Sequence, residues 1–176
     1  GMGLERVASV MQKVPSNYET DLMASLVTAI AKAGNIKYEV GPTQTYTSLK
    51  VISDHLRATT FLIADGVLPS NEGRGYVLRR ILRRAIRHGK LLGFEKPFLS
   101  QLVPEVGKLM GSVYSEVKDR QSHIVNVVRA EEERFYETLA MGTERLSEKI
   151  EALKKAKSNQ LSGDEAFMLY DTYGFP

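Results

Sequence analysis

The chain has 176 residues with a formal net charge of +3, and 43% of its residues are hydrophobic and 26% charged, a balance typical of a globular domain. No apolar run approaches the roughly 20 residues that a membrane-spanning helix needs, and no apolar leader opens the chain, so we predict a cytoplasmic protein without a membrane partner. Cysteine is absent and the three histidines are scattered (His55, His88 and His123), which predicts neither a disulfide nor a metal site.

The first third of the sequence predicts three helices. Apolar residues recur at helical spacing after the glycine-rich start, and again in two further stretches that end at Gly34 and near Asp65. The expected helices begin at Leu4, Tyr18 and about Leu49, and the second and third end at Gly34 and near Asp65. A glycine cap is expected at Gly34, and Asp65 is expected to cap the turn at Gly66.

The segment from Tyr76 to Leu92 alternates pairs of apolar and basic residues, which predicts a helix with one buried and one basic face. No acid lies between Glu72 and Glu95. Two neighbouring rows of arginines result, one formed by Arg79, Arg83 and Arg87 and the other by Arg80 and Arg84. A concentrated basic face in an otherwise acidic chain favours a polyanionic partner such as nucleic acid. The alternative is a solvated helix face, with some arginines paired to acids elsewhere.

A short helix is expected at residues 99–110, followed by the longest regular stretch. Its apolar residues alternate steps of seven and four (Val117, Ile124, Val128, Phe135, Leu139, Leu146 and Ile150). This 11-residue repeat, about 3.67 residues per turn, predicts a straight helix over about 114–157 that serves as a packing strut. Ser162 and Glu165 have the spacing of a capping box that opens a last short helix.

Several strings carry a family resemblance. Gly1-Met2-Gly3-Leu4-Glu5-Arg6 resembles motif 3 of class II aminoacyl-tRNA synthetases. Five further strings follow in order: 54–57 (Asp-His-Leu-Arg), 61–66 (Phe-Leu-Ile-Ala-Asp-Gly), 69–72 (Pro-Ser-Asn-Glu), 74–80 (Arg-Gly-Tyr-Val-Leu-Arg-Arg) and 169–176 (Leu-Tyr-Asp-Thr-Tyr-Gly-Phe-Pro). Together they resemble the alanine–tRNA ligase family, in its bacterial form, from the first residue to the last.

The resemblance implies a mainly α fold. Residues 1–13 would be the motif-3 remnant of the class II α/β catalytic domain. Residues 14–176 would form a helical tRNA-recognition domain that includes the long helical strut. The catalytic motifs 1 and 2 are expected to be missing, and the zinc-containing editing domain of the family would follow Pro176. We therefore expect this part to be inactive alone.

The implied activity is the activation of alanine with ATP and Mg²⁺, followed by transfer of alanine to tRNA(Ala). The family's ATP-binding role falls on Gly1, Gly3 and Arg6. A planar, permanently charged guanidinium can hold phosphate oxygens, and glycines let the backbone lie close to a nucleotide. Arg6 could equally pair with an acid on an exposed first turn.

The resemblance also assigns residues to the tRNA acceptor stem. Asn71 and Asp171 would read its G·U wobble pair. Two or three of the five arginines of the basic helix would contact its backbone, and the others would pair with acids of the long helix (Arg79, Arg80, Arg83, Arg84 and Arg87). A wobble pair leaves the guanine 2-amino group in the shallow minor groove, where a carboxylate can accept its protons. Without the resemblance, Asn71 is read as a turn former and Asp171 as the end of a helix.

Two other functions fit parts of the sequence. A stand-alone helical RNA-binding module without catalysis would need the same helices. A helix-turn-helix DNA binder is disfavoured because major-groove readers usually present Asn, Gln and Ser among their basic residues, and this face presents arginines alone. We therefore predict no DNA partner.

Overall fold

The computed structural model describes residues 1–155, 158 and 160–171, with Asp171 described by its backbone alone. The regular elements of the described residues are all helical, which confirms the predicted mainly α fold. The chain packs as two compact units, Gly1–Glu132 and Glu133–Pro176, each of which is described by itself. None of the helices within the described residues is both long and apolar enough to cross a bilayer.

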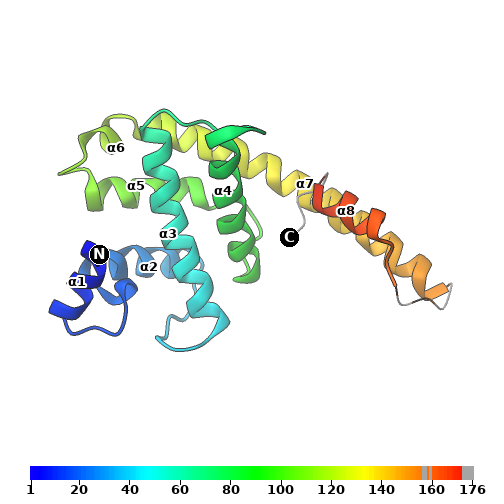
Figure 1. Cartoon of the computed structure of the whole chain (residues 1–176), viewed down its shortest axis with the longest axis horizontal. Helices are drawn as coiled ribbons and strands as arrows, with labels where there is room; N and C mark the ends of the chain where they lie inside the picture. The colour runs from blue at the N-terminus through cyan, green and yellow to red at the C-terminus, as the bar shows by residue number, and fades with distance from the viewer. Residues whose placement is uncertain (156–157, 159, 172–176) are drawn as a thin grey trace. The chain divides into compact units, whose positions relative to one another are not determined.

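Figure 1 shows the elements in chain order. Their bounds are α1 (Leu4–Met11), the 3-10 helix η1 (Asn17–Glu19), α2 (Asp21–Ala33), α3 (Gln44–Ala64), α4 (Gly73–Leu91), α5 (Leu99–Met110), α6 (Ser115–Asp119), α7 (Gln121–Lys155) and α8 (Gly163–Asp171).

The core of the first unit is built around α3, which packs against α2, α4, α5 and α6, with α4 running alongside it (Figure 1). Both helices contribute fully buried apolar side chains: Leu49, Ile52, Leu56 and Ile63 from α3, and Leu78, Leu82 and Ile86 from α4. They recur at steps of three, four or seven residues, so each helix buries one stripe. The basic residues of α4 are thereby left on its other faces.

Two predicted helix ends are confirmed with a change of detail. Gly34 is the C-cap of α2 but has φ −92°, and the left-handed conformation falls on Asn35, with φ 50°. A larger residue at position 34 would crowd its neighbours, because a Cβ there would lie 2.6 Å from Phe94 Cζ. Asp65 is the C-cap of α3 and is followed by Gly66 with φ 87°, a conformation that glycine adopts without strain.

The long helix begins at Gln121 rather than near residue 114. The helical conformation is interrupted at Arg120, which follows the short helix α6 as its C-cap. At this break the Arg120 guanidinium donates a 2.6 Å hydrogen bond to the carbonyl oxygen of Ala64, the last residue of α3. The predicted apolar stripe is fully buried at Ile124 and Val128, whereas Ile150 is 42% exposed. It therefore acts as a packing seam only over its first part.

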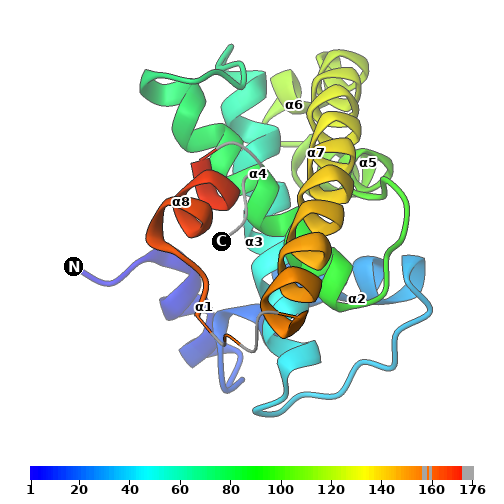
Figure 2. The ribbon, with the colours of Figure 1, turned by 90° about the vertical axis from the view of Figure 1, so that its right-hand side faces the viewer.

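The second unit contains the rest of α7 and α8, which turns back along it (Figures 1 and 2). Lys149 Nζ lies 2.5 Å from Glu165 Oε1 and joins the two helices. The predicted capping box is present. The Glu165 amide donates to Ser162 Oγ at 3.3 Å, and the Ser162 amide donates to Glu165 Oε2 at 3.3 Å.

Candidate nucleic-acid interface

The arginines of α4 divide into an exposed set and an engaged set. Arg80, Arg84 and Arg87 are exposed and lie at positions i, i+4 and i+7, so they share one side of the helix. The Arg80 guanidinium lies 5.7 Å from the centre of the Tyr76 ring, a cation–π distance. This exposed set, which we call the arginine row, is the part of α4 best placed to meet a polyanion.

Arg79 and Arg83 instead face α7. Arg83 Nε donates to Glu131 Oε1 at 2.9 Å, and Arg79 Nε lies 3.1 Å from the same oxygen in an ion pair without hydrogen-bond geometry. Glu131 is only 4% exposed. A buried carboxylate is tolerated only when it is well paired, and here the partners of Glu131 are Arg79 and Arg83. Both arginines therefore have a partner inside the protein. The predicted backbone contacts of Arg79 and Arg83 with RNA stay predictions.

Asn71 lies in the short loop between α3 and α4, next to the start of the basic helix. Arg79 NH1 donates a hydrogen bond to its Oδ1. The loop also packs directly on the first turn of α4, because a Cβ on Gly75 would lie 2.3 Å from the Leu68 carbonyl oxygen and 2.2 Å from Ser70 Oγ. Glycine at position 75 therefore lets the Asn71 loop lie against α4.

The electrostatic effect of the arginine row reaches His88, on the same helix. Burial lowers the pKa of His88, and the positive charges of Arg84 and Arg87 lower it further. The imidazole is therefore neutral near pH 7, with Nδ1 3.0 Å from Ser48 Oγ of α3. The same guanidinium charges favour the approach of an anion such as a phosphate group.

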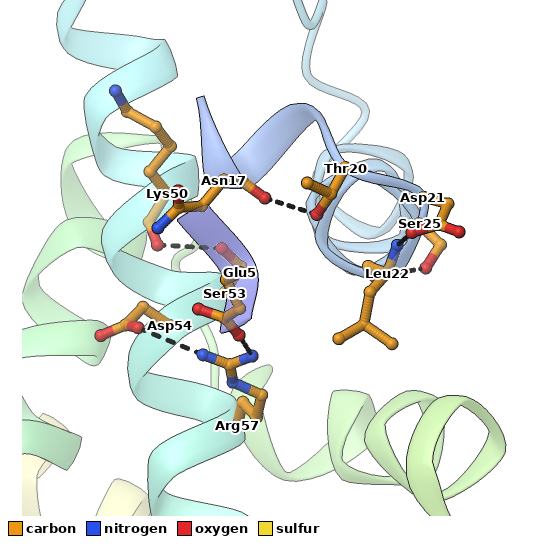
Figure 3. Close-up of polar contacts among 10 residues, drawn as sticks. All are labelled: Glu5, Asn17, Thr20, Asp21, Leu22, Ser25, Lys50, Ser53, Asp54 and Arg57. Atoms are coloured by element: carbon orange, nitrogen blue, oxygen red, sulfur yellow. Dashed lines mark hydrogen bonds and ion pairs between the residues drawn. The ribbon is translucent and has the colours of Figure 1, made fainter. Parts of the chain in front are cut away.

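Figure 3 shows how α1 is attached to α3. Arg57 lies between two carboxylates, pairing with Glu5 of α1 through NH1 and lying 3.8 Å from Asp54 Oδ1 through NH2. The hydrogen bond from His55 lowers the pKa of Asp54, an effect that burial opposes and Arg57 reinforces. The first helix is thus held in place by an ion pair between its first turn and α3.

The predicted ATP-binding residues lie at the exposed start of α1. Gly3 is the N-cap of this helix, and a Cβ on either Gly1 or Gly3 would meet no atom of the described chain within 4 Å. Arg6 is exposed, and among the described residues its side chain has no hydrogen-bond or ion-pair partner. The alternative in which Arg6 pairs with an acid is therefore not observed within the described part. Its role toward a nucleotide stays a prediction.

Comparison with known proteins identifies the family of this chain. A family profile described as "tRNA synthetases class II (A)" matches residues 1–176. The chain belongs to the class II tRNA synthetases. It is 52% identical over 176 residues to an alanine–tRNA ligase of Geobacillus thermodenitrificans and 55% identical over 177 residues to that of Enterococcus faecalis. All of this chain is covered in both comparisons, but it spans about a fifth (20%) of the length of these relatives.

Two predicted features of this class II synthetase chain lie partly or wholly outside the described residues. Asp171 is the last residue of α8, in the second unit, and its side chain is not described. Residues 172–176, which complete the last family string, lie outside as well. Within the residues that are described, His, Cys, Asp and Glu form no group of three or more that could hold a metal ion.

Two glutamates without a predicted role, Glu131 and Glu132, have buried side chains in this class II synthetase chain. Glu131 pairs with Arg79 and Arg83, and Glu132 is fully buried against the start of α5. Both follow the buried Val128 by three and four residues, so helical spacing places them on or beside the packing stripe. An acid on such a stripe indicates a buried partner, and this signal is present in the sequence.

Proposed function

We propose that this chain is the part of an alanine–tRNA ligase that binds the acceptor stem of tRNA(Ala). The observation that carries the proposal is the arrangement on α4. The Asn71 loop packs on the first turn of this helix, at Gly75, and the exposed arginine row lies on the turns that follow. Phosphate contacts from the arginines would set the position of the RNA, and Asn71 would supply a contact to a base edge.

Asn71 and Asp171 would read the G·U wobble pair. In the wide minor groove of RNA, this pair offers the guanine 2-amino group and the uracil carbonyl oxygen side by side. A carboxylate accepts from the amino group, and an amide NH₂ donates to the carbonyl. Both chemical groups are therefore supplied by the two residues that the family strings assign.

The remaining parts of the activity concern alanine and ATP. In the proposed ligase, Gly1 and Gly3 would lie against the nucleotide, and Arg6 would bind its phosphates during formation of alanyl-adenylate, with Mg²⁺ as the accompanying ion. The exposed position of Arg6 at the start of α1 supports this role, since its guanidinium is open to a ligand.

The test of tRNA reading compares aminoacylation of G·U and G·C forms of tRNA(Ala) by the full-length enzyme carrying Asn71→Ala or Asp171→Ala. Each substitution is expected to remove ~1–3 kcal/mol of discrimination, about 5- to 150-fold in the ratio of kcat/KM values, as for a good base contact. Asn126→Ala and Asp164→Ala, at exposed positions of α7 and α8, are the matched controls. Equal losses on both tRNAs would show that the two residues support the fold and do not read the pair.

A further inference from the structure

We propose that Arg79, anchored on Glu131, is a positioning residue that fixes the orientation of the Asn71 amide for reading the acceptor stem. This inference rests on the proposed function and adds the device that holds the reading residue. Its three members come from three different elements, since Asn71 lies in the α3–α4 loop, Arg79 on α4 and Glu131 on α7.

The first step concerns which atom of the amide faces Arg79. A guanidinium carries only hydrogen-bond donors, so the group that it contacts must be an acceptor. The atom of the Asn71 amide that contacts Arg79 NH1 is therefore its carbonyl oxygen. With Oδ1 committed to Arg79, the NH₂ group of Asn71 points elsewhere and is the group available to a base edge.

The second step concerns why the amide needs to be held. The last torsion of an asparagine joins a tetrahedral to a planar atom, and it has a broad, roughly two-fold profile. A loop that is merely packed against α4 through Gly75 would leave the amide free to exchange its oxygen and nitrogen. A donor on one side removes this freedom. Arg79 supplies that donor, and its own side chain is only 14% exposed.

The third step concerns what holds Arg79. Its Nε lies 3.1 Å from Glu131 Oε1, and the same oxygen accepts from Arg83 Nε at 2.9 Å. A buried carboxylate held by two arginines one turn apart on α4 has little room to move. The position of the Asn71 amide is therefore tied to α7, through a chain of two polar contacts.

The experiment uses the full-length ligase with Glu131→Gln, which keeps the shape of the side chain but removes its charge. The expected result is a G·U over G·C ratio of kcat/KM lowered about 2- to 10-fold, in the lower part of the range for coupled neighbours. Alanine-dependent pyrophosphate exchange should stay unchanged. Glu133→Gln, at the exposed neighbouring position of α7, is the matched control and should leave both readouts unchanged.

A second variant keeps the proposal testable if Glu131→Gln does not fold. Arg79→Lys retains a cation opposite Glu131, but a single ammonium group cannot reproduce the forked contact with Glu131 and Asn71 together. It should lower the same ratio. In an Asn71→Ala background, neither substitution should lower the ratio further, because the amide that they position is gone.

The outcomes separate the two proposals. If Asn71→Ala leaves the G·U over G·C ratio unchanged, the proposed reading function fails, and this inference fails with it. If Asn71→Ala lowers the ratio but folded Glu131→Gln and Arg79→Lys enzymes keep it, the reading function stands and the positioning role is overturned. Equal losses on both tRNAs in the Glu131→Gln enzyme would likewise overturn it, as they would indicate a structural role alone.

Discussion

Glu132 of α7 caps a helix other than its own. Its carboxylate accepts hydrogen bonds from the amides of Phe98, Leu99 and Ser100, at 2.6, 2.8 and 3.1 Å. These amides are at the start of α5, which has no capping side chain of its own. Burial raises the pKa of Glu132, although the hydrogen bonds to the three amides act in the opposite direction. A negative charge at a helix N-terminus is favourable, but complete burial makes ionisation of this group expensive.

Removing the Glu132 carboxylate should destabilise the first unit. We expect Glu132→Ala to lower the free energy of unfolding by about 1–3 kcal/mol, because buried amides would then be without an acceptor. The folded-state pKa is raised above the ordinary value of 4.5, so the stability contribution of this group is present below that value and is lost as the pH rises through the folded pKa. The advantage of the native protein over Glu132→Gln should therefore shrink as the pH rises above 4.5, which a comparison at about pH 4 and about pH 7 measures.

Urea unfolding of the native, Glu132→Gln and Glu132→Ala proteins at the two pH values measures both effects. Glu133→Gln is the control, since this neighbour is exposed. A difference between native and Glu132→Gln proteins that does not change with pH would contradict the linkage argument.

At the residue scale, sequence predicts contacts that are local and misses those that depend on packing. The capping box of Ser162 and Glu165 joins residues three positions apart and follows from their spacing. The bond from Phe98 to Glu132 spans 34 positions and exists only because α7 lies against the start of α5. For the same reason, the repeat of arginines predicts a basic helix but does not tell which of them face α7.

At the scale of one element, α4 combines a core face, an internal pairing face and an exposed basic face. Leu78, Leu82 and Ile86 are fully buried, whereas the arginine row is exposed. If the proposed contact with tRNA is made by this row, binding should depend steeply on salt, because each neutralised phosphate releases counterions.

Replacing Arg80 and Arg84 together by glutamine should reduce the slope of log affinity against log salt. We expect a change of roughly 0.7–0.9 for each phosphate that these arginines no longer neutralise. Binding of tRNA(Ala) to the full-length enzyme over about 50–200 mM salt gives the slope. Replacement of Lys32 and Lys118, which are exposed on α2 and α6, removes the same charge elsewhere and should leave the slope nearly unchanged. Similar changes in the two double variants would show that net charge, and not the arginine row, controls binding.

At the scale of the whole chain, the class II synthetase family and the helical fold could be predicted from motif strings and periodicity. The division into units at residues 132 and 133 could not, because it falls inside α7, where helical spacing continues without interruption. We also expect a domain boundary after residue 13, with α1 belonging to the catalytic domain of the family. This boundary stays a prediction.

We expect the 176-residue chain alone not to form alanyl-adenylate. It spans 20% of the length of its relatives. The groups that we propose for binding a nucleotide are Gly1, Gly3 and Arg6. Positioning of both substrates supplies much of the rate of such a reaction, and three groups at one helix start cannot provide it. Alanine-dependent pyrophosphate exchange by the isolated chain is the measurement, with the full-length enzyme as the positive control. Exchange above background would overturn this expectation.

In the full-length enzyme, Arg6→Ala should slow alanine activation far more than it weakens tRNA binding. A charge-assisted contact to reacting phosphates strengthens in the transition state, so its removal falls on kcat of the activation step. Pyrophosphate exchange and tRNA affinity, measured on the same variant, separate the two effects. A loss of tRNA affinity with normal exchange would move Arg6 out of the nucleotide site.

Polar contacts to three other helices are made by the residue before α7 and by two residues of its first half, and this limits where the sequence can change in length. Arg120 holds the end of α3, Glu131 holds two arginines of α4, and Glu132 holds the start of α5. One residue inserted between Arg120 and Glu131 would rotate both carboxylates by about 100° and shift them by about 1.5 Å along the helix. Both would then miss their partners together. Homologous sequences are therefore expected to carry substitutions at exposed positions aligned with residues 121–130 but no insertions or deletions there. An alignment of the family with gaps in this interval would contradict that expectation.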